Sequence, residues 1–379
     1  MIRKQQNRIA LGCFFFLCGF CFSTWASRIP TIMTLFEMNE AQLGSFLFIL
    51  PISSLIGLPL SAWIVSKFDS RYLLFFGFLL FATALFGIGV SGQIEHLIFA
   101  VALFALGLRA INISMNTQAI QLQKLYKKKI NGKFHGFWSL GGLCGLIFAT
   151  LIINLKITIG YHLGLVAIVS IFVCFVAYFY LLRNDKESTG NKLQFGKPDN
   201  FILHTGLVVF SAAVCEGGIY DWSSVYFREV VGAELFTLSY LVFMISMTIS
   251  RFFTDQIITK IGMPKLFVFS AGVIILGVSI LILFPYFYTA LLGFFIAGFG
   301  VASIFPMAFL LAGQSKKYAP GMAISIVGTY STLGVLIAPP FIGYLAHVFN
   351  LNKAFLFFIA AALLLLYFSR KAFFYLEKQ

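Results

Sequence analysis

The chain has 379 residues, of which 60% are hydrophobic and 11% are charged, whereas soluble domains contain about 25% charged residues. So little polar surface excludes a soluble globular protein, a disordered chain and a nucleic-acid-binding domain. The six cysteines lie in apolar stretches, which argues against a disulfide framework, and the composition predicts a protein with many membrane-spanning segments.

The hydrophobic runs continue for about twenty residues or more, the length of a helix that crosses a hydrocarbon core of ~30 Å. Strands of outer-membrane barrels are only about half as long and alternate in polarity. The runs cover residues 9–33, 42–66, 72–91, 97–123, 134–155, 160–182, 201–228, 236–259, 266–285, 288–312, 321–347 and 353–373. They predict an all-α membrane protein with twelve transmembrane helices.

Lysine and arginine gather at both ends of the chain and in every second connection between these runs. The connection after the fourth run alone contains Lys124, Lys127, Lys128 and Lys129, whereas the opposite connections hold little beyond Lys156, Arg228 and Lys353. By the positive-inside rule, both termini are predicted to lie in the cytoplasm. The net charge of +14 is therefore a topology signal that needs no nucleic-acid partner.

A polar stretch without apolar periodicity occupies the middle of the chain, which predicts a cytoplasmic linker over 183–200. It would separate one six-helix bundle (1–182) from a second (201–379). The halves also resemble each other, because the second and eighth runs are both followed by a short basic turn. Such internal repeats are typical of transporters with a solute site near the bilayer midplane, between the halves.

Over nearly its whole length the chain resembles the major facilitator superfamily. The basic turns around Asp69-Ser70-Arg71 and Lys260 look like degenerate copies of that family's loop motif, with Ser66 and Thr259 at its usual acidic position. A closer resemblance is to the bacterial inner-membrane branch near the fucose permease. It is carried by Trp25-Ala26-Ser27-Arg28-Ile29-Pro30, Met115-Asn116-Thr117-Gln118-Ala119, the segment from Phe134 to Gly142, Glu216-Gly217-Gly218-Ile219-Tyr220-Asp221-Trp222-Ser223, Arg251 with Asp255, and Pro339-Pro340-Phe341-Ile342-Gly343. The resemblance implies a multi-pass transporter in the bacterial inner membrane.

Six charged residues lie within the predicted spans, although a charge at the bilayer centre costs roughly 2.5–3.5 kcal/mol on insertion scales. They are Arg28, Arg109, Glu216, Asp221, Arg251 and Asp255. Glu216 is the strongest candidate for proton coupling, because partial burial of a carboxyl favours its neutral form. A fixed ion pair is the alternative. Asp221 is the second candidate, and Gly217-Gly218 between the two acids would permit local unwinding.

The three arginines each have two interpretations. Arg251 and Asp255 are spaced i, i+4, so they can form an internal ion pair near the cytoplasmic gate. Alternatively, Arg251 is the electrostatic partner of a carboxylate that gains and loses a proton. Arg28 either extends to the interface or lines an outward cavity. Arg109 stands in the fourth run, where the related branch leads us to expect a small or polar residue. It favours an anionic solute, unless it pairs with Glu216 or Asp221.

The expected solute contacts also include neutral polar and aromatic residues. Asn112 and Asn116 share a helix face, with Gln118 nearby, and can form a hydrogen-bonding wall. Trp25, Trp138 and Trp222 can stack on a solute, although tryptophan near the end of a span is often an interfacial anchor. Cys18 and Cys21 have the spacing of a metal or redox motif, but no histidine lies nearby, so we expect no metal and no cofactor.

The leading functional hypothesis is a secondary transporter that moves a sugar, sugar acid or other small organic anion by alternating access, in symport with protons. Its expected partners are the solute, protons and membrane lipid, and we expect a monomer. The first alternative is a proton-antiporting exporter of amphipathic compounds. A membrane enzyme or sensor is the remote alternative, because no phosphate-binding loop, zinc-protease motif or nucleophile elbow is present.

Overall fold

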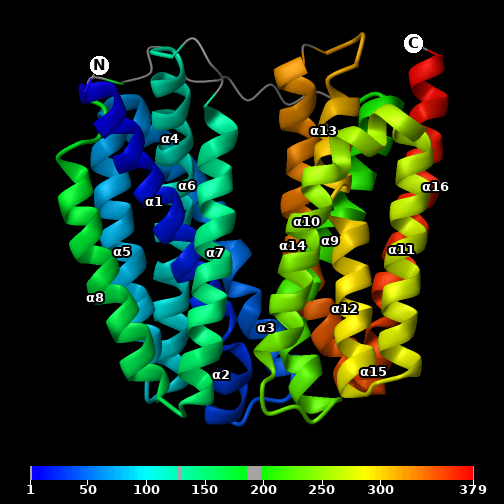
Figure 1. The fold of residues 1–379 in the computed structure, drawn as a ribbon, viewed down its shortest axis with the longest axis horizontal. Coiled ribbons are helices and arrows are strands. Elements are labelled where there is room, and N and C mark those ends of the chain that lie inside the picture. The colour runs from blue at the N-terminus through cyan, green and yellow to red at the C-terminus, as the bar shows by residue number, and fades with distance from the viewer. Residues whose placement is uncertain (1, 127–129, 184, 186–197, 319, 379) are drawn as a thin grey trace. The chain divides into compact units, whose positions relative to one another are not determined.

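The computed structural model describes residues 2–126, 130–183, 185, 198–318 and 320–378, and within these residues the regular structure is helical throughout (Figure 1). The helices are α1 (Ile2–Ala26), α2 (Ile29–Leu35), α3 (Glu40–Leu47), α4 (Ile49–Lys67), α5 (Ser70–Val90), α6 (Ile94–Gln123), α7 (Asn131–Asn154), α8 (Ile159–Tyr178), α9 (Asn200–Glu229), α10 (Thr237–Ile261), α11 (Met263–Leu283), α12 (Phe287–Val301), α13 (Ile304–Ala312), α14 (Pro320–Phe349), α15 (Leu351–Ala354) and α16 (Leu356–Glu377).

Twelve segments of the described residues are long and apolar enough to cross a membrane, which confirms the prediction of twelve transmembrane helices. Some spans consist of two consecutive helices, because a turn interrupts the segment. The first span, Lys4–Leu35, joins α1 to α2, and the second, Glu40–Val65, joins α3 to most of α4. The tenth, Phe287–Ala312, joins α12 to α13. The orientation of the termini stays a prediction.

Contacts divide the chain into two compact units, and the first consists of residues 1–36 and 49–193. Within it, α1 packs along α7, and α6 packs against both α4 and α5. Aromatic side chains fill the contact between α1, α5 and α6. The ring of Phe104 stacks on Phe81 at 4.3 Å between centroids and lies 5.7 Å from the indole of Trp25. Such ring pairs add specific geometry to the apolar contact.

The second unit consists of residues 37–48 and 194–379. Its central helix is α9, which packs against α14 and α16, while α12 packs against α10 and α11. The buried hydroxyl of Tyr226 on α9 lies 2.6 Å from the carbonyl oxygen of Leu281 and 2.8 Å from Oδ1 of Asn352. This polar contact links three helices inside an otherwise apolar core.

Helix α3 belongs to the second unit, although it lies within the range 1–182 that the sequence analysis assigns to the first bundle. The reason is a close backbone crossing between α3 and α14. A Cβ atom at Gly44 would lie 2.8 Å from the carbonyl oxygen of Pro339, and one at Gly343 would lie 2.4 Å from that of Glu40. Only glycine fits both positions. Most of the predicted linker, 183–200, lies outside the described residues.

The tenth span is broken between α12 and α13, at Ala302 and Ser303. Pro306 has no backbone N–H, so the carbonyl oxygen of Ala302, four residues earlier, cannot receive its helical hydrogen bond. The hydroxyl of Ser250 on α10 donates to the carbonyl oxygen of Phe299 at 2.9 Å. Ser270 on α11 contacts the hydroxyl of Ser303 at 3.0 Å. Side chains of neighbouring helices therefore surround the break.

Candidate functional site

Glu216 lies on α9 and forms an ion pair with Arg251 on α10. The guanidinium Nη2 of Arg251 lies 3.3 Å from Oε1 of Glu216. The Glu216 side chain is 14% exposed and that of Arg251 is 36% exposed, so the pair is only partly shielded from its surroundings. The hydroxyl of Tyr220, one turn further along α9, donates to the same carboxylate oxygen at 3.1 Å. A carboxylate and its cation therefore meet inside the spanning part of unit 2.

Within the described chain, one carboxylate oxygen of Glu216 lacks a hydrogen-bond partner, and Arg251 has a second acceptor besides Glu216. Oε2 of Glu216 is buried and has no hydrogen-bond partner among the described residues. Nε of Arg251 points toward the carbonyl oxygen of Ala302 at 3.5 Å, the carbonyl that Pro306 leaves without a helical donor. Arg251 therefore contacts a titratable carboxylate through Nη2 and a fixed carbonyl through Nε. Tyr220 was not singled out by the sequence analysis, although its i, i+4 spacing from Glu216 is a signal.

Asp221 and Trp222 follow on the same helix but have different surroundings. Asp221 is half-buried and forms no hydrogen bond or ion pair with the residues that the structure describes. Trp222 is fully buried, and its indole N–H has no acceptor within the described chain. The structure therefore separates Asp221 from the Glu216–Arg251 pair and encloses Trp222 in the core of its unit.

Arg28 stands at the turn between α1 and α2 and is only 4% exposed. Its Nε donates to Nδ1 of His162 on α8 at 3.0 Å, and its Nη2 donates to the carbonyl oxygen of Ile157 at 2.8 Å. Since Nδ1 of His162 accepts this bond, the imidazole is neutral with its proton on Nε2. Arg28 therefore links α1 to α8 within unit 1. The nearby Trp25 packs its ring against Phe104 and so links α1 to α6.

Arg109 lies on α6, and its Nε donates to the carbonyl oxygen of Ser54 on α4 at 3.2 Å. Glu216 and Asp221 belong to the other unit, so the alternative that Arg109 pairs with one of them stays a prediction. Asn112 is half-buried, and the amide of Asn116 donates to the Asn112 carbonyl of its own helix at 2.7 Å. The half-buried Arg109 therefore lies about one helical turn from Asn112 and two turns from Asn116 on the same helix.

Trp138 on α7 is half-buried beside Phe22, with 6.5 Å between the ring centroids. The side chain of Asp255 lies outside the described residues, so the predicted pair of Asp255 with Arg251 stays a prediction. Cys18 and Cys21 are buried in the packing of α1, and the thiol of Cys21 contacts the hydroxyl of Ser170 at 3.3 Å. No cluster of metal-ligating side chains occurs among the described residues.

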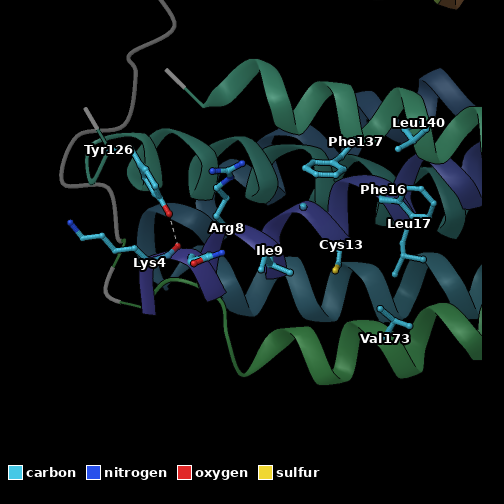
Figure 2. A pocket seen from close by; sticks show the side chains of 12 residues that line it. Lys4, Arg8, Ile9, Cys13, Phe16, Leu17, Tyr126, Phe137, Leu140 and Val173 are labelled. Atoms are coloured by element: carbon cyan, nitrogen blue, oxygen red, sulfur yellow. Dashed lines mark hydrogen bonds between the residues drawn. The ribbon is translucent and has the colours of Figure 1, made fainter. Parts of the chain in front are cut away.

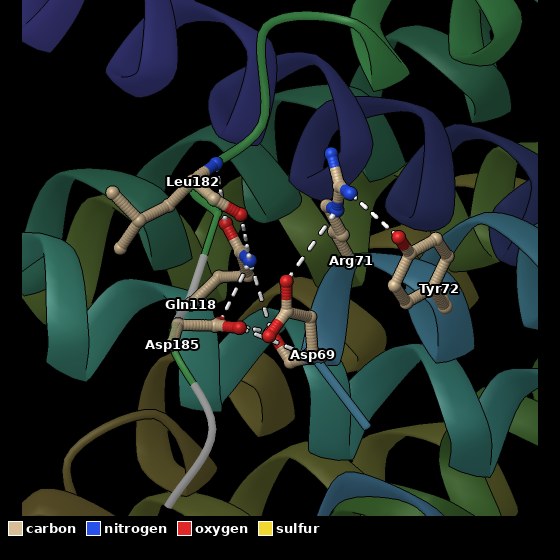
Figure 3. Close-up of polar contacts among 7 residues, drawn as sticks. Asp69, Arg71, Tyr72, Gln118, Leu182 and Asp185 are labelled. Atoms are coloured by element: carbon tan, nitrogen blue, oxygen red, sulfur yellow. Dashed lines mark hydrogen bonds and ion pairs between the residues drawn. The ribbon is translucent and has the colours of Figure 1, made fainter.

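A buried polar network at one end of unit 1 was missed by the sequence analysis (Figure 3). The backbone N–H of Ser70, in the first turn of α5, donates to Oδ1 of Asp185 at 3.0 Å, and the Ser70 hydroxyl donates to Oδ2. The amide of Gln118 donates to Oδ2 of Asp185 at 2.8 Å, and its oxygen accepts from the N–H of Leu182 at 3.1 Å. Asp185 thus caps a helix more than a hundred residues away.

Stability is expected to depend on the ionisation of Asp185. Burial raises the pKa of this carboxyl above its ordinary value, and the charge of Asp69 adds to the shift, while hydrogen bonds from Ser70 oppose it. A raised pKa in the folded state means that this group's stabilising contribution is present at low pH and is lost as the pH rises through that pKa. The melting temperature of the wild type, relative to the Asp185→Asn variant, should therefore fall as the pH rises from acidic toward neutral. A constant difference between the two proteins would contradict this coupling.

The sequence and the fold match known membrane transporters. The sequence profile of the Major Facilitator Superfamily matches residues 11–317. An uncharacterized MFS-type transporter of Yersinia pestis is 26% identical over 343 residues, 90% of this chain and 89% of its own length. Membrane protein MosC of Rhizobium meliloti is 27% identical over 366 residues, covering 95% of this chain and 89% of its own.

Solved structures agree in fold. The nucleoside transporter NupG, as a D323A mutant, superposes with a TM-score of 0.80 at 12% identity, over 97% of this chain and all of that one. A bacterial homologue of the human lysosomal transporter Spinster gives a TM-score of 0.76 at 13% identity, over 97% of each chain. Identities this low show the fold alone. Together with the profile match over most of the sequence, they show that this chain belongs to the Major Facilitator Superfamily and is a multi-pass bacterial membrane transporter.

Proposed function

We propose that this transporter moves a small polar organic solute by alternating access, and that protonation of Glu216 is coupled to the movement. The observation that supports the coupling is the partly exposed Glu216–Arg251 pair inside unit 2. A proton on Glu216 cancels the charge that holds Arg251, and the guanidinium then keeps the Ala302 carbonyl as its acceptor. Loss of the proton restores the pair. Asp221, which has no partner in the described chain, is the second proposed proton site.

The proposed solute class is an organic anion, such as a sugar acid or another carboxylate. Arg109 supports it, because this cation lies within a span and pairs with no carboxylate among the described residues of unit 1. Asn112, Asn116 and Trp138 are the other proposed contacts, since these side chains remain at least partly exposed. Trp25, Arg28 and Trp222 are buried within their units, so we propose packing roles for them. The resemblance to the branch near the fucose permease favours sugar-like solutes.

A thermal-shift screen of the purified protein tests the solute class. Neutral sugars, sugar acids, organic acids and nucleosides are compared at equal concentration. A ligand present at 100 times its Kd stabilises the folded protein by about 2.7 kcal/mol. We expect stabilisation by a carboxylate-bearing solute, and its loss in Arg109→Ala, because that change removes the unpaired cation. Lys124→Ala is the matched control, since Lys124 follows α6 outside the span and is exposed. Stabilisation by neutral solutes alone, unchanged in Arg109→Ala, would remove the anion proposal.

The solute identified in this way is then tested in proteoliposomes. Under the proposal, an acidic exterior drives accumulation of the solute, and a protonophore abolishes it. Accumulation that persists after collapse of the proton gradient contradicts proton coupling. Proton-driven extrusion instead of uptake would favour the antiport of amphipathic compounds.

A further inference from the structure

A cavity of about 780 Å³ within unit 1 lies outside the proposed solute contacts. Its floor is formed by α1, with α7 on one side and α8 on the other (Figure 2). The lining combines cations at one end with apolar side chains along the rest. The lining includes Lys4, Arg8, Cys13, Phe137, Leu140 and Val173.

The shape of this cavity follows from helix packing. Helix α1 packs along α7 and also against α8, while α7 and α8 make little contact with each other. The surface of α1 therefore forms the floor of a groove between them. Two smaller cavities continue it along the same helix, one sharing Ile9 and Cys13 and the other sharing Phe16 and Leu17. From Lys4 to Phe20 the groove extends over about 24 Å at 1.5 Å per residue, more than the ~15 Å half-thickness of a hydrocarbon core.

The charge at the end of the groove is positive and uncompensated. No acidic side chain lines the cavity. Within the described residues, the guanidinium of Arg8 has no hydrogen bond or ion pair, and Nζ of Lys4 makes a single hydrogen bond, to the carbonyl oxygen of Leu125 at 3.3 Å. The hydroxyl of Tyr126 donates to the Lys4 carbonyl oxygen at 2.7 Å, which keeps Lys4 beside the end of α6 (Figure 2).

We propose that this groove binds one anionic phospholipid, whose phosphate lies on Lys4 and Arg8 and whose acyl chain follows α1 between α7 and α8. An arginine and a lysine without carboxylate partners complement a phosphate, and the guanidinium can donate two parallel hydrogen bonds to it. The apolar walls and their length match an acyl chain. In the predicted orientation this lipid belongs to the cytoplasmic leaflet, whose surface potential is negative. This site involves neither Glu216 nor Arg109, so it is independent of the proposed solute and proton sites.

Native mass spectrometry of the detergent-purified protein tests the proposal with phosphatidylglycerol and phosphatidylcholine of equal chain length. Wild-type protein should bind phosphatidylglycerol about tenfold tighter, since each cation near a membrane surface favours an anionic lipid. The double variant Lys4→Gln with Arg8→Gln should lose this preference. Lys316→Gln with Lys317→Gln is the matched control, because it removes two exposed charges from the connection between α13 and α14. The control should keep the preference.

A second variant tests the groove itself. Val173→Trp adds an indole to the α8 wall and should weaken binding of both lipids, while the melting temperature reports whether the fold is retained. Inorganic phosphate in tenfold excess should not displace the lipid, because it has no acyl chain to fill the groove. The proposal is overturned by equal binding of the two lipids, by an equal loss in the Lys316/Lys317 control, or by displacement with phosphate alone.

Discussion

Replacing Glu216 with glutamine is expected to abolish uphill uptake while leaving the exchange of solute across the membrane measurable. One proton that moves through a potential of 100 mV supplies about 2.3 kcal/mol. This free energy supports a solute gradient of roughly fiftyfold. Glutamine keeps the size and a carbonyl acceptor for Tyr220 and Arg251 but cannot exchange a proton. The accumulation ratio in proteoliposomes should therefore fall from this range to about one.

The matched control is Glu229→Gln, at the last residue of the same helix. Glu229 pairs with Arg228 at 3.7 Å, and its side chain is 44% exposed. This variant should accumulate solute as the wild type does. Asp221→Asn should give an intermediate loss if Asp221 binds a second proton. Full accumulation by Glu216→Gln would contradict the assignment of Glu216 as the coupling residue.

Replacing Arg251 with methionine is expected to lower the free energy of unfolding by about 1–3 kcal/mol, the cost of leaving a buried polar group without its partner. Methionine removes both the partner of the Glu216 carboxylate and the donor to the Ala302 carbonyl. A fully buried pair would cost 3–5 kcal/mol when broken, but Arg251 is partly exposed, which reduces the effect. The measurement is thermal unfolding of the purified protein in detergent.

A surface pair provides the comparison. Arg228→Met breaks the more exposed pair with Glu229 and should cost less than about 1 kcal/mol. The effect of Arg251→Met should also shrink when Glu216 is already glutamine, since no buried carboxylate is then left unpaired. Equal costs in both backgrounds would show that the Glu216–Arg251 contact contributes nothing to stability.

The predictions from the sequence agree best with the structure for features that consecutive residues determine, such as the transmembrane spans. A run such as 72–91 has too few polar side chains to remain in water, and its length fits one crossing of the bilayer, so helix number and order could be read directly. The ends of the helices shifted by a few residues. The breaks at Arg28 and Ala302 also have local causes, because Pro30 and Pro306 lack the backbone N–H of a helical hydrogen bond.

The partners of the charged residues could not be read in the same way. Spacing along one helix identifies only neighbours on that helix, so it indicated Asp255 as a neighbour of Arg251 but could not say which carboxylate of another helix the guanidinium reaches. In the structure that carboxylate is Glu216 on α9. Asp185 lies in a polar segment that has no periodic pattern, yet it caps α5 beside Gln118 of α6.

The sequence by itself determined that this protein lies in a membrane, that it has twelve transmembrane spans, and that some spans contain charged residues, which the bilayer disfavours. Only the tertiary structure decided which charge meets which, and that Arg8 remains unpaired beside an apolar groove in the described part of unit 1. The physical reason is that the insertion of a helix into a membrane depends on the summed hydrophobicity of consecutive residues, which the sequence lists directly. An ion pair instead requires two charged side chains within about 4 Å of each other. Which side chains come that close depends on how helices far apart in the sequence pack together.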